Sequence, residues 1–193
     1  MSVTKLCLSA IVALATAFSA TAATIDVGGA KIEDAFELQG SKLQLNGAGV
    51  RYRAVFKVYA AGLYLSKKAA TPEEFFAAPG PKRLSITLLR DVDADDLGKA
   101  FTKGFEENSP KAEMSRLTPG LVRMGQIFSD QKKIALGENF TIDWVPSIGT
   151  IISVKGKPQG EPFKEPEFYA ALMRIWLGPN PADAKLKDAL LGK

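Results

Sequence analysis

Residues 45–68 read LNGAGVRYRAVFKVYAAGLYLSKK, and this stretch predicts two neighbouring strands that form a hairpin. Side chains alternate between the faces of a strand, so Arg51 and Arg53 share one face of the first strand and Val50 and Tyr52 share the other. The second strand is expected over 56–66. A strand that only buries a core does not need a guanidinium group. Arg51 therefore either meets water or a surface acid, or it points at a ligand.

Strands and helices are expected in separate parts of the chain, without a regular alternation. Strands are predicted on both sides of the hairpin turn within residues 45–68, over 82–92, and twice within 132–156. Helices are predicted to begin near Thr71-Pro72, at Asp93 (running through Asn108), at Thr118-Pro119, at Pro166 (ending at Gly178) and at Asn180–Asp183. This order indicates an α+β fold, in which one antiparallel sheet carries helices on one face.

The first 23 residues have the composition of a secretory signal peptide. A basic start with Lys5 is followed by an apolar run over 6–18 and by small residues at 19–23. The run is shorter than the roughly 20 residues that a membrane anchor needs. We therefore expect residues 1–23 to be removed and residues 24–193 to form one domain, periplasmic or secreted from a bacterium. No membrane span is expected after that removal.

Composition excludes several kinds of chemistry. The chain has no histidine, and its single cysteine, Cys7, lies in the signal segment. Triads that depend on histidine, histidine zinc sites, thiolate catalysis and disulfides are therefore not expected. The net charge of +4 becomes +3 without Lys5, and no basic cluster suggests nucleic acid as a partner. Any chemistry must use arginine, lysine, tyrosine, carboxylates or backbone dipoles.

Two motifs resemble cofactor or metal sites only in part. Residues 91–96 begin like a calcium loop, but Asp96 replaces the required glycine and Thr102 replaces the bidentate glutamate. Residues 47–52 begin like a dinucleotide fingerprint but lack its third glycine and its βαβ context. We therefore expect neither a metal nor a cofactor.

Several segments together resemble one protein family. They are Gly49–Arg51, Lys57–Leu65, Ser85–Val92, Phe168–Pro179 and Lys185–Leu191. They are similar to the chalcone isomerase-like family, and most of all to its secreted bacterial branch. The resemblance implies an open-faced β-sandwich with a large antiparallel sheet, a covering layer of helices and a ligand cleft between them.

The resemblance also implies roles for particular residues. Arg51 takes the place of the arginine that faces the substrate in the plant enzymes, and that meets a carboxylate, helped by a tyrosine, in the fatty-acid-binding members. Tyr59 stands where the plant enzymes have a threonine, and Ile175 stands where a hydroxyl residue is usual. The tyrosine and asparagine of the plant middle helix have no counterpart over 94–103. One arginine alone stabilises an enolate poorly.

Our leading hypothesis is a non-catalytic, exported protein of this family that binds a small, apolar anionic ligand such as a fatty acid. Arg51 would pair with the anion, Tyr59 or Tyr64 would contribute a hydroxyl, and Ile175 would line the cleft. One alternative is an isomerase of the intramolecular lyase type that acts on a chalcone-like phenolic enone. In that case Arg51 would stabilise the oxyanion and Tyr59 would donate a proton. Another alternative is a periplasmic module that binds a protein partner and has a closed cleft.

Overall fold

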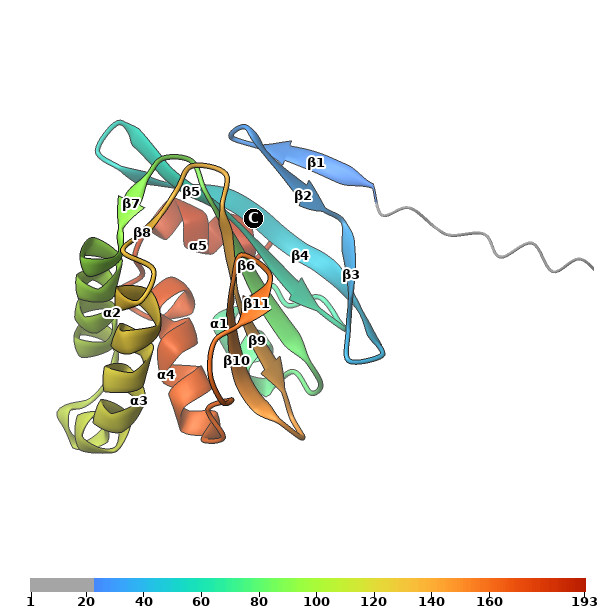
Figure 1. Cartoon of the computed structure of the whole chain (residues 1–193). Helices are drawn as coiled ribbons and strands as arrows, with labels where there is room; N and C mark the ends of the chain where they lie inside the picture. Colours follow the sequence, from blue (N-terminus) through green and yellow to red (C-terminus); the bar gives the residue numbers. More distant parts are fainter. Residues whose placement is uncertain (1–22) are drawn as a thin grey trace, which may run out of the picture.

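The computed structural model describes residues 23–193, so the predicted signal segment 1–23 lies almost wholly outside the described residues. The centre of the fold is a seven-stranded antiparallel sheet (Figure 1). Its strands follow the order β11 (Lys157–Pro158), β10 (Gly149–Val154), β9 (Asn139–Val145), β6 (Lys82–Leu88), β5 (Phe56–Leu65), β4 (Ser41–Arg53) and β3 (Ala35–Leu38). Two small sheets accompany it, one of β1 (Thr24–Val27) with β2 (Ala30–Glu33) and one of β7 (Val92–Asp93) with β8 (Lys133–Ile134).

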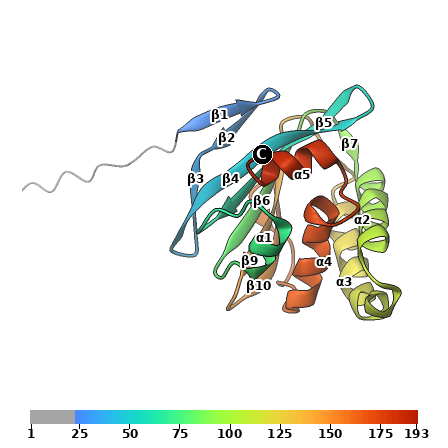
Figure 2. The same ribbon diagram turned by 180° about the vertical axis from the view of Figure 1, so that it is seen from behind.

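The predicted hairpin is confirmed as the β4–β5 pair, which lies toward the β3 edge of this sheet. Arg51 is the cross-strand partner of Tyr59, and the register shifts once near Gly47 and once after Arg51. Gly47 marks a close backbone approach. A β-carbon at this position would lie 2.1 Å from the carbonyl oxygen of Ala189, in the last helix. The glycine therefore lets that helix rest directly on β4 (Figure 2).

Helices lie on one face of the sheet (Figures 1 and 2). They are α1 (Pro72–Ala77), α2 (Ala94–Asn108), α3 (Lys111–Ser129), α4 (Pro166–Leu177) and α5 (Ala184–Leu190). The α4 helix contacts β10 on one side and α2 and α3 on the other, so these helices bury one continuous core against the sheet. This arrangement confirms the predicted α+β class and the open-faced β-sandwich.

The opposite face of the sheet has a smaller apolar cluster of its own. It includes Ala30 and Ile32 of the β1–β2 hairpin together with Leu43 and Tyr64 of the sheet. The two faces thus have separate cores, and residues five apart on β5, such as Tyr59 and Tyr64, belong to different ones.

Two local predictions are wrong. The third helix begins at Lys111 and contains Pro119, whereas the sequence suggested a start at Thr118-Pro119. The Thr118 hydroxyl donates a hydrogen bond to the carbonyl of Met114 one turn earlier, an interaction that a helix interior allows. Residues 132–156 form three strands, not two, because the short strand β8 pairs with β7. Within residues 23–193, no helix has both the length and the apolar character needed to cross a bilayer.

Candidate functional site

A cavity of about 580 Å³ lies on the helix-covered side of the sheet, at the end where the β4–β5 hairpin turns. The hairpin, the end of β6, the α2 helix and the segment after α4 enclose it. Its apolar lining consists of Val58, Leu88, Val92, Leu97, Ala100, Ile175, Pro181 and Ala182. Arg51 and Tyr59 also line the cavity, while other charged side chains surround it. This volume lies within the usual range of small-molecule pockets.

Arg51 is the cationic lining residue that lies beside Tyr59. Its Nε atom is buried and has no hydrogen-bond partner, and its guanidinium carbon lies 5.6 Å from the centre of the Tyr59 ring. No carboxylate among residues 23–193 forms an ion pair with it. Asp183 is the acid in this region, but its two oxygens accept hydrogen bonds from the backbone N–H groups of Tyr52 and Leu186. The guanidinium therefore has hydrogen-bonding capacity that the protein does not use.

Tyr59 lies beside Arg51 and is almost completely buried. The indole Nε1 of Trp176, on α4, donates a hydrogen bond of 2.8 Å to its hydroxyl oxygen. Burial raises the pKa of Tyr59, while the nearby charge of Arg51 and the hydrogen bond from Trp176 lower it by a smaller amount. Tyr59 is thus a neutral hydroxyl at physiological pH. Because Trp176 donates to its oxygen, its own proton remains free for a further acceptor.

Ile175 gives the cavity an apolar wall where the resemblance would lead one to expect a hydroxyl. It projects from α4 toward α2 and packs against Gly104. A β-carbon at Gly104 would lie only 2.9 Å from two carbon atoms of the isoleucine side chain. The missing side chain at Gly104 therefore provides the space that Ile175 occupies beside the cavity.

Tyr64 does not lie with the other three predicted residues. It belongs to the cluster on the opposite face of the sheet, and its hydroxyl donates a hydrogen bond of 2.9 Å to the carbonyl oxygen of Glu33. Of the two tyrosines considered for contributing a hydroxyl, the structure brings Tyr59 to Arg51 and places Tyr64 elsewhere. Period-two alternation already separates the two residues, because five positions along a strand lead to opposite faces.

A clamp between two asparagines holds one wall of the cavity. The buried side chain of Asn108, at the end of α2, donates to the carbonyl of Asn180 and accepts from its N–H, at 2.8 and 2.9 Å. This pair fixes the segment after α4, which carries Pro181 and Ala182 into the cavity lining. Sequence reasoning missed both asparagines, since they lie 72 positions apart.

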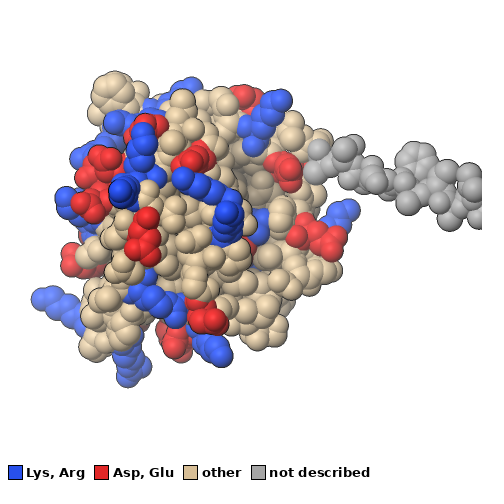
Figure 3. All heavy atoms as spheres, viewed as in Figure 1, with Lys and Arg blue, Asp and Glu red and all other residues tan. Residues whose placement is uncertain are grey.

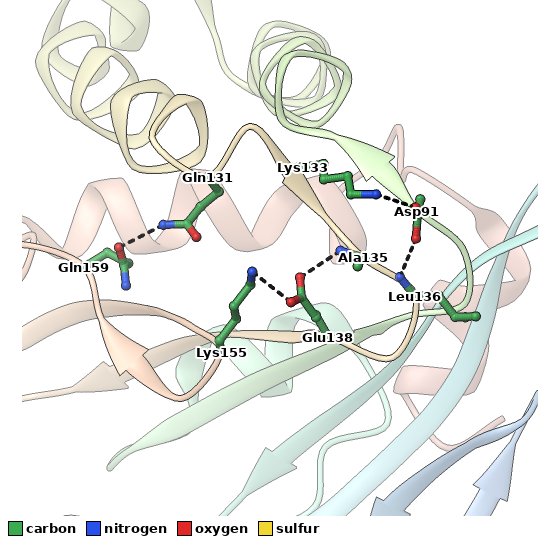
Figure 4. A network of polar contacts seen from close by, with 8 residues as sticks. All are labelled: Asp91, Gln131, Lys133, Ala135, Leu136, Glu138, Lys155 and Gln159. Carbon is green, nitrogen blue, oxygen red and sulfur yellow. Dashed lines mark hydrogen bonds and ion pairs between the residues drawn. The ribbon is translucent and has the colours of Figure 1, made fainter.

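Charged residues around the cavity were also missed as a group. The basic ones are Arg53, Arg90, Lys99 and Lys103, and the acidic ones are Asp91, Asp93, Asp96 and Glu107. Some of this charge is already compensated. Asp91 accepts hydrogen bonds from Lys133 and from the N–H of Leu136, both at 2.8 Å, and these bonds lower its pKa (Figure 4). The side chains of Lys103 and Glu107 pair along α2.

Metal-ligating side chains do not cluster at this cavity among residues 23–193. Across residues 23–193, no group of three or more histidine, cysteine, aspartate or glutamate side chains is arranged to hold a metal ion. The site offers a part-desolvated guanidinium and a neutral phenol in a cavity with both apolar and charged walls.

Comparison with known proteins identifies the family. The model of the chalcone isomerase-like family matches residues 23–192, so the chain belongs to that family. Among solved structures, the fatty-acid binding protein AtFAP1 of Arabidopsis thaliana is similar in fold, with a TM-score of 0.64 and 14% sequence identity. The alignment covers 84% of this chain and 92% of that one. No curated protein matches the sequence significantly.

Proposed function

We propose that this protein binds a small, mostly apolar molecule with an anionic head, such as a fatty acid, and that it does so without catalysing a reaction. Arg51 would pair with the anion, Tyr59 would donate a second hydrogen bond, and Ile175 would contact the apolar part. The ligand would occupy the cavity between the β4–β5 hairpin, α2 and the segment after α4.

The observation that carries this proposal is the unpartnered, buried Nε atom of Arg51. A buried polar group without a partner costs about 1–3 kcal/mol, and more when it is charged. Carboxylates match guanidinium because they accept two parallel hydrogen bonds from its fork of N–H groups. An incoming carboxylate would therefore offset the cost of burying the Nε atom of Arg51 without a partner.

The composition of the cavity supports an apolar body for the ligand. Of the 20 lining residues, nine are charged, and seven leucine, isoleucine, valine or alanine side chains form the apolar part of the lining. Burial of a hydrocarbon chain against such a surface is favourable by about 25 cal/mol per Å². AtFAP1, which shares this fold, is itself described as a fatty-acid binding protein.

An isomerase acting on a phenolic enone is the second candidate, and Tyr59 bears on it. A proton donor in catalysis works best when its pKa is close to the working pH. Burial raises the pKa of Tyr59 above the usual tyrosine value, further from neutral pH. Tyr59 is therefore suited to donating a hydrogen bond and poorly suited to giving up its proton. We expect chalcones to cyclise no faster with the protein than in buffer, as followed by absorbance.

The test compares a charged ligand with its uncharged analogue. Lipid-free protein is titrated by calorimetry with lauric acid and with dodecanol, which has the same chain length but no carboxylate. We expect Arg51→Met to weaken laurate binding by roughly 10- to 100-fold, the equivalent of about 1.5–3 kcal/mol for hydrogen bonds between charged groups. Dodecanol binding should hardly change.

The matched control is Arg116→Met, which removes an exposed arginine from α3, away from the cavity lining. It should leave both affinities unchanged. Equal laurate affinity in the wild type and in Arg51→Met would reject the proposal, and so would the absence of any laurate binding by the wild type.

A further inference from the structure

The turn of the β4–β5 hairpin is unusually apolar for an exposed loop. Val55 is 82% exposed, Phe56 is 62% exposed and Tyr52 is 44% exposed. Ala54 adopts a positive φ of 53° at the turn, which fixes the tight bend between the strands. Figure 1 shows this turn projecting from one corner of the sheet, beyond β7, and Figure 3 shows uncharged side chains projecting at the same corner. We call residues 52–57 the hairpin tip.

Basic side chains surround these apolar residues. Arg53 and Lys57 belong to the tip itself, and the guanidinium carbon of Arg90 lies 6.0 Å from the centre of the Phe56 ring. Lys57 donates a hydrogen bond of 3.2 Å to the carbonyl of Gly28. Figure 3 shows lysine and arginine side chains at this corner, with aspartate and glutamate side chains beside them. The tip thus combines exposed apolar side chains with a ring of positive charge.

In the part of the chain that the structure describes, the acidic residues nearby form no ion pairs with the basic side chains of the tip. Asp183 accepts hydrogen bonds from the N–H groups of Tyr52 and Leu186, so its negative charge lies at the start of the tip and offsets one of the three basic charges there, while Asp91 is paired with Lys133. Asp93 in β7 and Asp96 in the first turn of α2 also line the cavity. No ion pair involves Arg53, Lys57 or Arg90 among residues 23–193.

Shape and charge together identify the occupant. A specific protein interface buries about 800 Å² on each partner, whereas the tip offers only three apolar side chains on a convex turn. A lipid surface has no such size requirement. It accepts a few apolar and aromatic side chains below the headgroups, and anionic headgroups attract lysine and arginine at the same level.

We propose that the hairpin tip docks on the surface of an anionic lipid bilayer. Arg53 and Arg90 belong both to the basic ring of the tip and to the lining of the cavity, so docking would bring the mouth of the cavity against the lipid. The bilayer would then be the source or destination of the ligand. The exchange of ligand with the bilayer rests on the proposed function, whereas docking itself does not.

Co-sedimentation with vesicles tests the docking. Wild-type protein should bind vesicles of phosphatidylcholine with about a third phosphatidylglycerol, bind pure phosphatidylcholine much more weakly, and be released as salt is raised. Val55→Ser together with Phe56→Ser should lower the partition coefficient at least about tenfold. Neither residue lines the cavity, so laurate binding in solution should be unchanged in this variant.

The matched control is Val122→Ser, which removes an apolar side chain of similar exposure, 69%, from α3. It should leave vesicle binding intact. Vesicle binding that is absent in the wild type, or unchanged in the double variant, would overturn the inference. Concentration-dependent dimerisation that the double variant abolishes would also overturn it, since the tip would then contact a second copy of the chain.

The same measurements separate this inference from the proposed function. Arg51→Met should still bind vesicles while it loses affinity for laurate. Intact laurate binding without vesicle binding rejects the docking alone, and intact vesicle binding without laurate binding rejects the ligand proposal alone.

Discussion

Arg51 and Tyr59 form a pair whose properties come from their surroundings more than from their residue types. An arginine at the end of a strand normally extends into water, where its charge costs nothing. Here the cross-strand pairing places it beside a buried tyrosine ring, with no carboxylate within ion-pairing distance among the described residues. Burying part of this charged group without a partner is unfavourable for folding. That cost is the reason for assigning the pair to ligand binding.

Tyr64, in contrast, belongs to the stability of the fold. Its buried hydroxyl donates to the carbonyl of Glu33, and burial, with Glu33 adding a smaller effect, raises the pKa of Tyr64 to about 12. We expect Tyr64→Phe to lower the free energy of unfolding by about 1 kcal/mol at neutral pH, through loss of this hydrogen bond. Urea denaturation measures the change, and laurate affinity should not respond.

The pH dependence of Tyr64→Phe follows from the same pKa. In the unfolded chain a tyrosine loses its proton near pH 10, whereas the folded protein holds the proton of Tyr64 to about pH 12. The unfolded state therefore binds fewer protons between these values, and wild-type stability falls as the pH rises from about 10 to 12. The variant lacks this contribution, so the stability difference should shrink over that window. A constant difference would contradict the assignment.

Among the elements, α5 depends on a glycine in β4. A β-carbon at Gly47 would lie 2.1 Å from the carbonyl oxygen of Ala189 and 2.8 Å from that of Leu190. Both contacts are with backbone, which cannot rotate away, so α5 would have to shift as a unit. We expect Gly47→Ala to lower the free energy of unfolding by about 1–3 kcal/mol in chemical denaturation.

The control for this prediction is Gly125→Ala, inside α3. A β-carbon there meets nothing within 4 Å, and alanine is the better helix former. Stability should therefore rise by about 0.5–1 kcal/mol. If Gly47→Ala left the free energy of unfolding unchanged or raised it, as Gly125→Ala should, then α5 would not need the close approach.

The sequence predicted those elements whose signals are local. Thr71 accepts a hydrogen bond from the N–H of Glu74 at the start of α1, as the capping pattern suggested. The same kind of signal at Thr118-Pro119 was misleading, because packing of α3 along α2 outweighs a proline at that position. The short strand β8 carries too few residues for any periodicity and exists through its pairing with β7.

Part of the candidate site was also accessible from the sequence. The position of Arg51 on the hairpin, opposite Tyr59, follows from strand pairing between neighbours in the chain. The hydrogen bond from Trp176 to Tyr59 spans 117 positions and could not be predicted, because it depends on how α4 crosses the sheet. The rim charges and the asparagine clamp come from tertiary packing for the same reason.

For the whole molecule, the two faces of the sheet differ in what they contain. The helix-covered face contains the cavity, and the opposite face contains a compact cluster under the β1–β2 hairpin. On that second face, Arg83 on β6 donates two hydrogen bonds of 2.6 Å to Asp143 on β9. The guanidinium carbon of Arg83 also lies 3.6 Å from the centre of the Phe36 ring on β3. One side chain thereby connects three strands.

Breaking this pair tests whether the faces are independent. Asp143→Ala leaves the half-buried Arg83 cation without its partner, and we expect the free energy of unfolding to fall by about 3 kcal/mol. Replacing both residues by leucine removes the uncompensated charge and should restore most of the stability, which urea denaturation can follow. Laurate affinity of folded Asp143→Ala should equal that of the wild type, because neither residue lines the cavity. A drop in affinity as large as that of Arg51→Met would mean that the second face also shapes the site.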